Sequence, residues 1–115
     1  MKSMNAPPDS TMDLQAMRDA AERARALLKV LSNPDRMLLL CKLAEGEHSV
    51  GALEAALGIA QPTLSQQLAV LRDEGLVQTR REGKQIHYTI SSPEALAVMR
   101  TLYELYCPRQ EGGAP

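Results

Sequence analysis

The sequence predicts a mainly helical domain with one β-hairpin, in the order helix, helix, helix, helix, strand, strand, helix. Apolar side chains recur at three- and four-residue steps over most of residues 11–75 and again over 92–106. Between these stretches, residues 77–90 alternate apolar and polar side chains, which is typical of strands. Residues 49–75 read as a short helix, a tight turn and a longer helix. Together with the hairpin that follows, this stretch predicts a winged helix-turn-helix.

Composition fits one domain but indicates no particular partner. The chain has 115 residues, of which 44% are hydrophobic, and its net charge is −1. We expect the domain at 11–107, with a disordered lead at 1–10 and a disordered tail at 108–115. The start of the chain does not resemble a secretory signal, and no apolar run approaches the ~20 residues of a membrane span. We therefore expect a cytoplasmic protein with no membrane partner, whose cysteines form no permanent disulfide.

The first two helices are predicted at about 11–31 and 34–45. In the first helix, Ser10 or Thr11 is the expected cap, and an apolar stripe ends near Leu31. Asn33 is suited to cap the second helix, with Pro34 at its first position. The second helix is apolar almost all round, so we expect it at the centre of the core. Cys41 lies inside that apolar run.

The helix-turn-helix is predicted from residue 49 to residue 75. Ser49 caps its first helix and Gly58 ends it. Pro62 opens the second helix, and Gly75 is suited to a left-handed cap at its end. The side chains expected to face the core are Leu64, Leu68, Ala69 and Leu71. The outer face carries hydroxyls and amides, namely those of Thr63, Ser65, Gln66 and Gln67.

The hairpin and the last helix complete the predicted fold. The strands are expected at 76–80 and 85–90, with a charged tip between them. Pro93 starts the last helix, whose expected inward stripe comprises Leu96, Met99, Leu102, Tyr103 and Tyr106. Cys107 follows this helix and continues the stripe.

The order of elements and several longer motifs resemble the ArsR/SmtB family of bacterial winged-helix repressors. The motifs are LSNPDRMLLL at 31–40, EGEHSVGAL at 45–53 and QPTLSQQLAVLRDEGLVQTRREGKQIHYTI at 61–90. The resemblance implies a homodimer that pairs its first and last helices and places two recognition helices on double-stranded operator DNA. The physical pattern agrees, because the first and last stripes exceed what a small core needs to bury.

The chain departs from relatives that sense metals. Their common thiolate site needs a Cys-x-Cys pair in the third helix, where this chain has SVGAL at 49–53. Another family site uses His and carboxylate ligands on the last helix, which here lacks that pattern. His48 and His87 are expected in a loop and in a wing strand, away from both cysteines. We therefore expect no metal site and no cofactor.

Two cysteines at positions 41 and 107 resemble the sulfide- and persulfide-responsive branch of the family. That resemblance implies that organic persulfides bridge Cys41 and Cys107 through a short sulfur chain. The bridge would release the repressor from DNA and derepress genes for sulfide oxidation. The simpler alternative is that Cys41 is a small buried hydrophobe and Cys107 a bystander at a helix end.

The DNA-binding side chains are predicted on the recognition helix and the wing. Gln66 and Gln67 can each offer a bidentate amide, which suits adenine best. Phosphate contacts near the helix start are expected from Gln61, Thr63 and Ser65. Wing contacts to phosphates or a minor groove are expected from Arg80, Arg81 and Lys84. The alternative for each of these side chains is a solvated surface without a ligand.

Three kinds of function remain open on sequence alone. The first is a thiol-switched repressor, for which a general disulfide sensor is a close variant. The second is a metal-responsive repressor whose site has an unfamiliar form, and the third is a winged-helix module that binds proteins. An enzyme is not expected, because no nucleophile and base, phosphate loop or paired acids are apparent and no residue is assigned a catalytic role.

Overall fold

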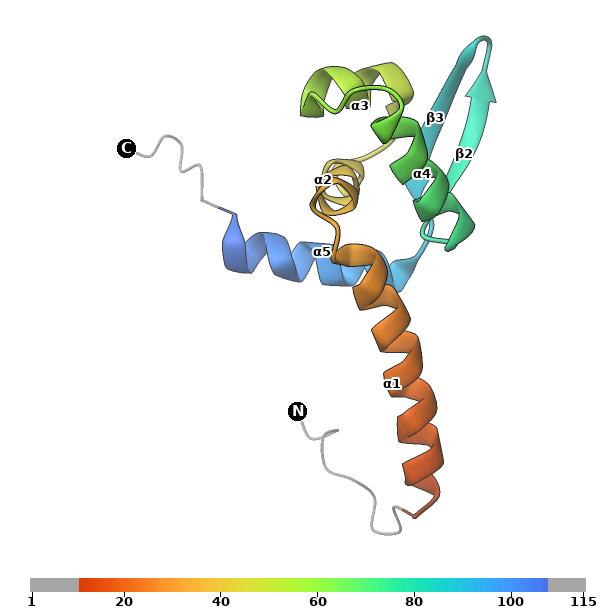
Figure 1. Cartoon of the computed structure of the whole chain (residues 1–115), viewed down its shortest axis with the longest axis vertical. Coiled ribbons are helices and arrows are strands. Elements are labelled where there is room, and N and C mark those ends of the chain that lie inside the picture. The colour runs from red at the N-terminus through yellow and green to blue at the C-terminus, as the bar shows by residue number, and fades with distance from the viewer. Residues whose placement is uncertain (1–10, 108–115) are drawn as a thin grey trace.

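Figure 1 shows the computed structural model, which describes residues 11–107. Within that range the predicted helices and hairpin are confirmed, and the fold is a winged helix-turn-helix. The expected lead and tail lie outside the described residues. The elements are α1 (Thr11–Leu31), α2 (Pro34–Leu43), β1 (His48–Ser49), α3 (Val50–Leu57), α4 (Thr63–Asp73), β2 (Val77–Glu82), β3 (Gln85–Ile90) and α5 (Pro93–Tyr106).

Helix α2 is the central element, as its apolar sequence predicts. It packs against α1, α3, α4, α5 and β3, and Figure 1 shows it enclosed by α3, α4 and α5. Leu39 and Leu40 are fully buried, and Leu43 is nearly so. The other fully buried large side chains come mainly from the helix-turn-helix and are Leu53, Leu64, Leu68 and Leu71. A close-packed leucine core therefore holds α3 and α4 on α2.

Three of the caps predicted from sequence are present, whereas Ser10, an expected cap of α1, lies outside the described residues. The side chain of Asn33 accepts a hydrogen bond from the backbone N–H of Arg36, and that of Ser49 accepts one from Ala52. Gly75 adopts a φ of 77°, the left-handed conformation expected at the end of the recognition helix. These caps fix where α2 and α3 begin and where α4 ends.

The sheet has a third strand that the sequence did not indicate. Strand β1 pairs antiparallel with β3, so that the strand order is β1-β3-β2. With only two residues, β1 carries no alternating pattern, and its strand conformation comes from pairing with Tyr88 and His87. His48 is therefore in a strand and not in the expected loop. The short strand joins the start of α3 to the wing.

Three side chains predicted to face the core are exposed. Ala69 of α4 is exposed, because the core already closes over Leu64, Leu68 and Leu71 without it. Tyr103 and Tyr106 of α5 are 53% and 79% exposed, since the end of α5 extends past α2. The C-terminal part of the predicted stripe is therefore exposed in the single chain, whereas Met99 is buried.

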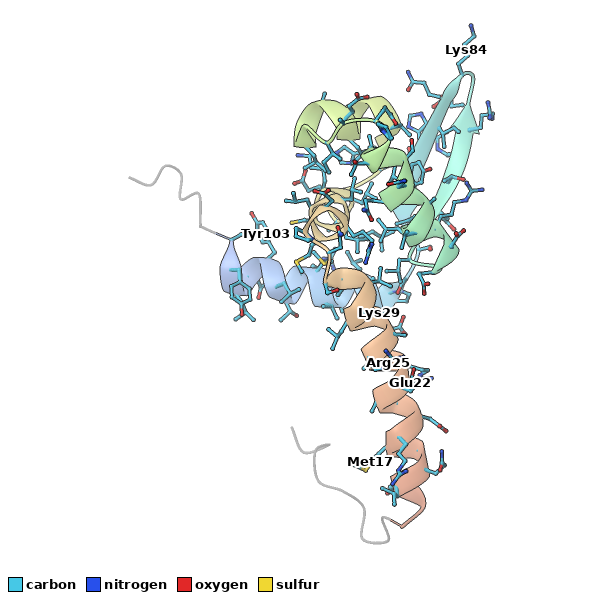
Figure 2. The ribbon with its side chains drawn as sticks, viewed as in Figure 1. Met17, Glu22, Arg25, Lys29, Lys84 and Tyr103 are labelled. Atoms are coloured by element: carbon cyan, nitrogen blue, oxygen red, sulfur yellow. The ribbon has the colours of Figure 1, made fainter. Side chains whose placement is uncertain are left out.

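Helix α1 projects away from the rest of the protomer (Figure 1). Its apolar stripe includes Leu14, Met17 and Leu28, which are all more than half exposed. Figure 2 shows Met17 on the projecting part of this helix. Among the described helices, none has the length and apolar character to cross a membrane.

Candidate functional site

The start of α4 presents polar side chains on its outer face. Pro62 occupies the cap position and supplies no side-chain hydrogen bond to the helix. Ser65 donates a hydrogen bond of 2.7 Å from its hydroxyl to Oε1 of Gln61. Gln61, Ser65 and Gln66 are exposed, whereas Thr63 is partly buried. The helix start thus offers amides, a hydroxyl and the positive end of the helix dipole to an anionic partner.

Gln67 differs from Gln66 although the two are adjacent. Its side chain is partly buried, and its Oε1 accepts a hydrogen bond of 2.9 Å from Nη1 of Arg36 on α2. The amide of Gln66 is exposed on the outer face. The structure therefore places only one of the two glutamines in the freely solvated position predicted for both.

The wing carries its cations in two different states. Lys84 stands at the tip of the hairpin (Figure 2), and Arg81 is also exposed. Arg80 is held by Glu47, to which its guanidinium donates two hydrogen bonds of 2.7 and 2.9 Å, and it also pairs with Glu82 at 3.3 Å. The hydrogen bonds to Glu47 raise the pKa of Arg80 above its ordinary value. Arg80 is thus engaged within the protein before any DNA arrives.

The two cysteines line one groove between α2 and α5. This groove has a volume of about 480 Å³, and the two thiols share it with apolar and aromatic side chains. Those side chains are Pro34, Met37, Leu38, Met99, Leu102, Tyr103 and Tyr106. Both cysteines are free thiols and partly buried. Residues 66 positions apart in sequence are therefore brought to one apolar surface.

The environment of Cys41 favours its protonated form. Burial raises the pKa of the Cys41 thiol above its ordinary value. The neighbouring Cys107 raises this pKa further, and Glu45 adds to the increase. Lys42 opposes these effects and lowers the pKa. Proximity to Cys107 is thus itself part of what sets the chemistry of Cys41.

Cys41 also borders a second, more polar groove. This groove has a volume of about 420 Å³ and is lined in part by Glu45, Arg100 and Glu104. Solutes can therefore approach Cys41 from a charged side as well as from the apolar one. Across residues 11–107, no three His, Cys, Asp or Glu side chains lie close enough together to hold a metal ion.

Two residues at these surfaces, Arg36 and Glu47, were not predicted from the sequence. Arg36 contacts the recognition helix, and Glu47 binds the wing. No local pattern singles out Arg36, because Asp35 and Lys42 are also charged residues of α2. No local pattern marks Glu47, because its partner Arg80 lies 33 residues away and is brought near only when β1 and β2 both pair with β3.

Comparisons with known proteins agree with this architecture. Residues 33–79 match the family model described as bacterial regulatory protein, arsR family. The chain is 51% identical over 98 residues to the biofilm growth-associated repressor of Agrobacterium fabrum, an alignment that covers 85% of this chain and 84% of the relative.

Two solved structures show the same fold. The crystal structure of the transcriptional repressor BigR from Xylella fastidiosa superposes with a TM-score of 0.77 at 48% identity, covering 83% of this chain and 97% of that one. Reduced HlyU from Vibrio cholerae superposes with a TM-score of 0.78 at 44% identity, covering 82% and 99%. The leucine core, the helix-turn-helix and the hairpin wing, together with these similarities, show that the chain belongs to the ArsR family of bacterial transcriptional regulators.

Proposed function

We propose that this regulator is a homodimeric repressor that binds operator DNA while Cys41 and Cys107 are reduced. Organic persulfides would bridge the two cysteines, lower the affinity for DNA and derepress genes for sulfide oxidation in the cytoplasm. The observation that carries the proposal is the shared apolar groove, which holds both thiols between α2 and α5. Two relatives are named as repressors, which supports repression as the direction of control.

The DNA interface of the proposal consists of the α4 start and the wing. Gln66 is proposed to read base edges in the major groove, while Gln61, Thr63 and Ser65 hold phosphates near the helix start. Arg81 and Lys84 are proposed to bind the DNA backbone or a minor groove, and Arg80 would join them once it leaves Glu47. The exposure of the helix face and of the hairpin tip supports these roles.

The proposed bridging chemistry uses persulfide as both sulfur donor and oxidant. A cysteine thiolate attacks the outer sulfur of R–S–SH, a thiolate RS⁻ leaves, and the cysteine becomes Cys–S–SH. When both cysteines carry a sulfur, the terminal sulfur anion of one attacks the inner sulfur of the other and expels HS⁻. The simplest product is a trisulfide, and the sum is two thiols and two persulfides giving the trisulfide, two thiols RSH and H₂S.

The raised pKa of Cys41 bears on the choice of oxidant. Neither cysteine lies at a helix N-terminus, where the dipole would stabilise a thiolate, and Cys107 follows the C-terminal end of α5. Burial further disfavours the Cys41 thiolate. A weakly nucleophilic pair is better matched to an activated sulfur electrophile than to peroxide. A reaction with hydrogen peroxide as fast as that of a dedicated peroxide sensor would contradict this selectivity.

The proposed coupling runs through α2, because this helix contacts both α5 and α4. A covalent link between Cys41 and Cys107 would fix α5 on α2 and restrict the placement of α4 on DNA. Coupling of about 1–3 kcal/mol is enough to weaken binding about 5–150-fold.

The chemical step is tested by the intact mass of the protein after treatment with glutathione persulfide, glutathione disulfide or hydrogen peroxide. We expect added sulfur within a cysteine bridge only after the persulfide, and no bridge in Cys41→Ser. A simple loss of two hydrogens with every oxidant would instead indicate a general disulfide sensor.

A further inference from the structure

Arg36 connects the end of α1 to the recognition helix. Its Nε donates a hydrogen bond of 2.7 Å to the backbone carbonyl of Val30, and its Nη1 donates one of 2.9 Å to Oε1 of Gln67. Its own backbone N–H is held at 3.0 Å by the capping side chain of Asn33. The guanidinium is partly buried and spans 31 residues of sequence to reach α4.

The chemistry of arginine fixes which end of the Gln67 amide faces α2. A guanidinium has five N–H donors and no acceptor, so only the oxygen of an amide can face it. The oxygen of Gln67 is thus turned toward Arg36, and the NH₂ group is the end turned away from it. A hydrogen bond from a charged donor is stronger than one between neutral groups, which favours this orientation.

This orientation conflicts with the role that the sequence predicted for Gln67. A bidentate contact to adenine needs the amide oxygen to accept from N6 while the amide nitrogen donates to N7. With its oxygen turned toward Arg36 on α2, Gln67 presents its NH₂ group, a donor, on the side away from α2. Guanine offers two acceptors, O6 and N7, on the same major-groove edge and has no donor there.

We propose that Arg36 is a positioning residue that makes Gln67 a hydrogen-bond donor selective for guanine over adenine in each half-site. Gln66, whose amide is exposed, keeps the capacity for a bidentate contact to adenine. The two adjacent glutamines therefore read different bases, and the difference arises from a residue that does not touch the DNA. The proposal depends on DNA reading by α4 and is independent of the cysteines.

The test selects bound duplexes from a pool of randomised DNA and compares the base preferences of the reduced wild type and its variants. In the wild type we expect one position per half-site to favour guanine over adenine about tenfold. Gln67→Glu keeps an acceptor for Arg36 but removes the donor, so the guanine preference should disappear. Arg36→Gln releases the amide, and adenine should become accepted at that position.

The matched control is Gln66→Ala, which should change preference at a different position and leave the guanine preference intact. A wild-type preference for adenine that is lost in Gln67→Glu would overturn the proposal. So would an Arg36→Gln variant that binds every sequence more weakly with unchanged preferences, since that is the result of a purely structural role. If Arg36→Gln does not fold, as judged by thermal melting, the wild type and Gln67→Glu decide the question alone.

Discussion

The two ends of the protomer are packed in different ways. The DNA-reading end comprises α3, α4 and the hairpin, and its leucines Leu53, Leu64 and Leu71 are fully buried. The opposite end comprises α1 and the end of α5, where Leu105 is 68% and Met17 is 62% exposed. The core of the reading end is therefore closed within one chain, whereas the other end leaves apolar side chains exposed.

This difference bears on where a chemical signal can act. The groove with both cysteines lies where α5 leaves the leucine core, so its walls are partly exposed. The reading helices are held by the close-packed core and the caps. We infer that a bridge between Cys41 and Cys107 alters how α4 is presented to DNA while the helix-turn-helix stays folded.

The largest effect, on the free energy of unfolding, is expected from a cavity in the DNA-reading end. Leu64→Ala should lower the free energy of unfolding by about 2–5 kcal/mol, because the side chain is fully buried and leaves a void. The exposed Ala69 on the same helix provides the control, and Ala69→Ser should change this free energy by less than about 0.5 kcal/mol. Urea denaturation of both variants measures the difference, and equal losses would show that α4 is not packed as described.

In the end formed by α1 and the end of α5, a substitution is expected to affect association of the proposed dimer more than the stability of the fold. Met17→Glu places a charge on the exposed apolar stripe of α1, so the dissociation constant of the homodimer should rise about tenfold or more. Sedimentation across protein concentrations measures this constant, and circular dichroism should report an unchanged fold. Arg18→Glu on the charged side of α1 serves as the control. Unchanged association in Met17→Glu would exclude this stripe from the interface.

A smaller effect, on DNA affinity, is expected from the ion pair between Glu47 and Arg80. Glu47→Gln removes the carboxylate that accepts both hydrogen bonds from Arg80. Arg80 then keeps only its longer contact to the exposed Glu82 and can neutralise a phosphate, so DNA of any sequence should bind more tightly, with a salt slope steeper by up to about one. Fluorescence anisotropy over a range of salt concentrations measures both. The variant Glu54→Gln removes an exposed carboxylate from α3 and controls for net charge. Identical slopes in the two variants would contradict a specific restraint by Glu47.

The smallest expected effect is in the pH dependence of Cys41 alkylation. Because burial raises its pKa, Cys41 in the variant Cys107→Ser should be alkylated by iodoacetamide with a midpoint above that of the same variant in urea. The unfolded chain ionises first as pH rises, so folding also loses stability as pH increases through the folded pKa. A folded midpoint at or below the urea value would contradict the burial of this thiol.

Much of the fold could be predicted because local patterns agree with it. Leucine spacing, the caps at Asn33 and Ser49 and the glycine at position 75 specify helices whose burial then follows. Strand β1 could not be predicted, since two residues become a strand only by pairing with β3. The exposure of Tyr103 and Tyr106 likewise depends on where α5 passes the end of α2, which no local pattern records.

Some features of the candidate site could likewise be predicted from the sequence, and others depend on tertiary structure. The polar face of α4 could be read from helical spacing, whereas the pairing of the two cysteines was implied by the resemblance to a family and not by spacing. The different states of Gln66 and Gln67 could not, because Arg36 lies 31 residues before Gln67 and meets it only after α2 packs on α4. The engagement of Arg80 by Glu47 depends in the same way on tertiary structure.

The central claim is that a bridge between Cys41 and Cys107 controls DNA affinity, and it is tested by measuring the bridged fraction and DNA release in the same samples. The reduced protein is titrated with glutathione persulfide, and the bridged fraction from intact mass is compared with the fraction released from a selected operator duplex. We predict that the two fractions rise together, that dithiothreitol reverses both, and that Cys41→Ser and Cys107→Ser bind DNA but show no release. Release of Cys41→Ser to the same extent as the wild type would contradict the account.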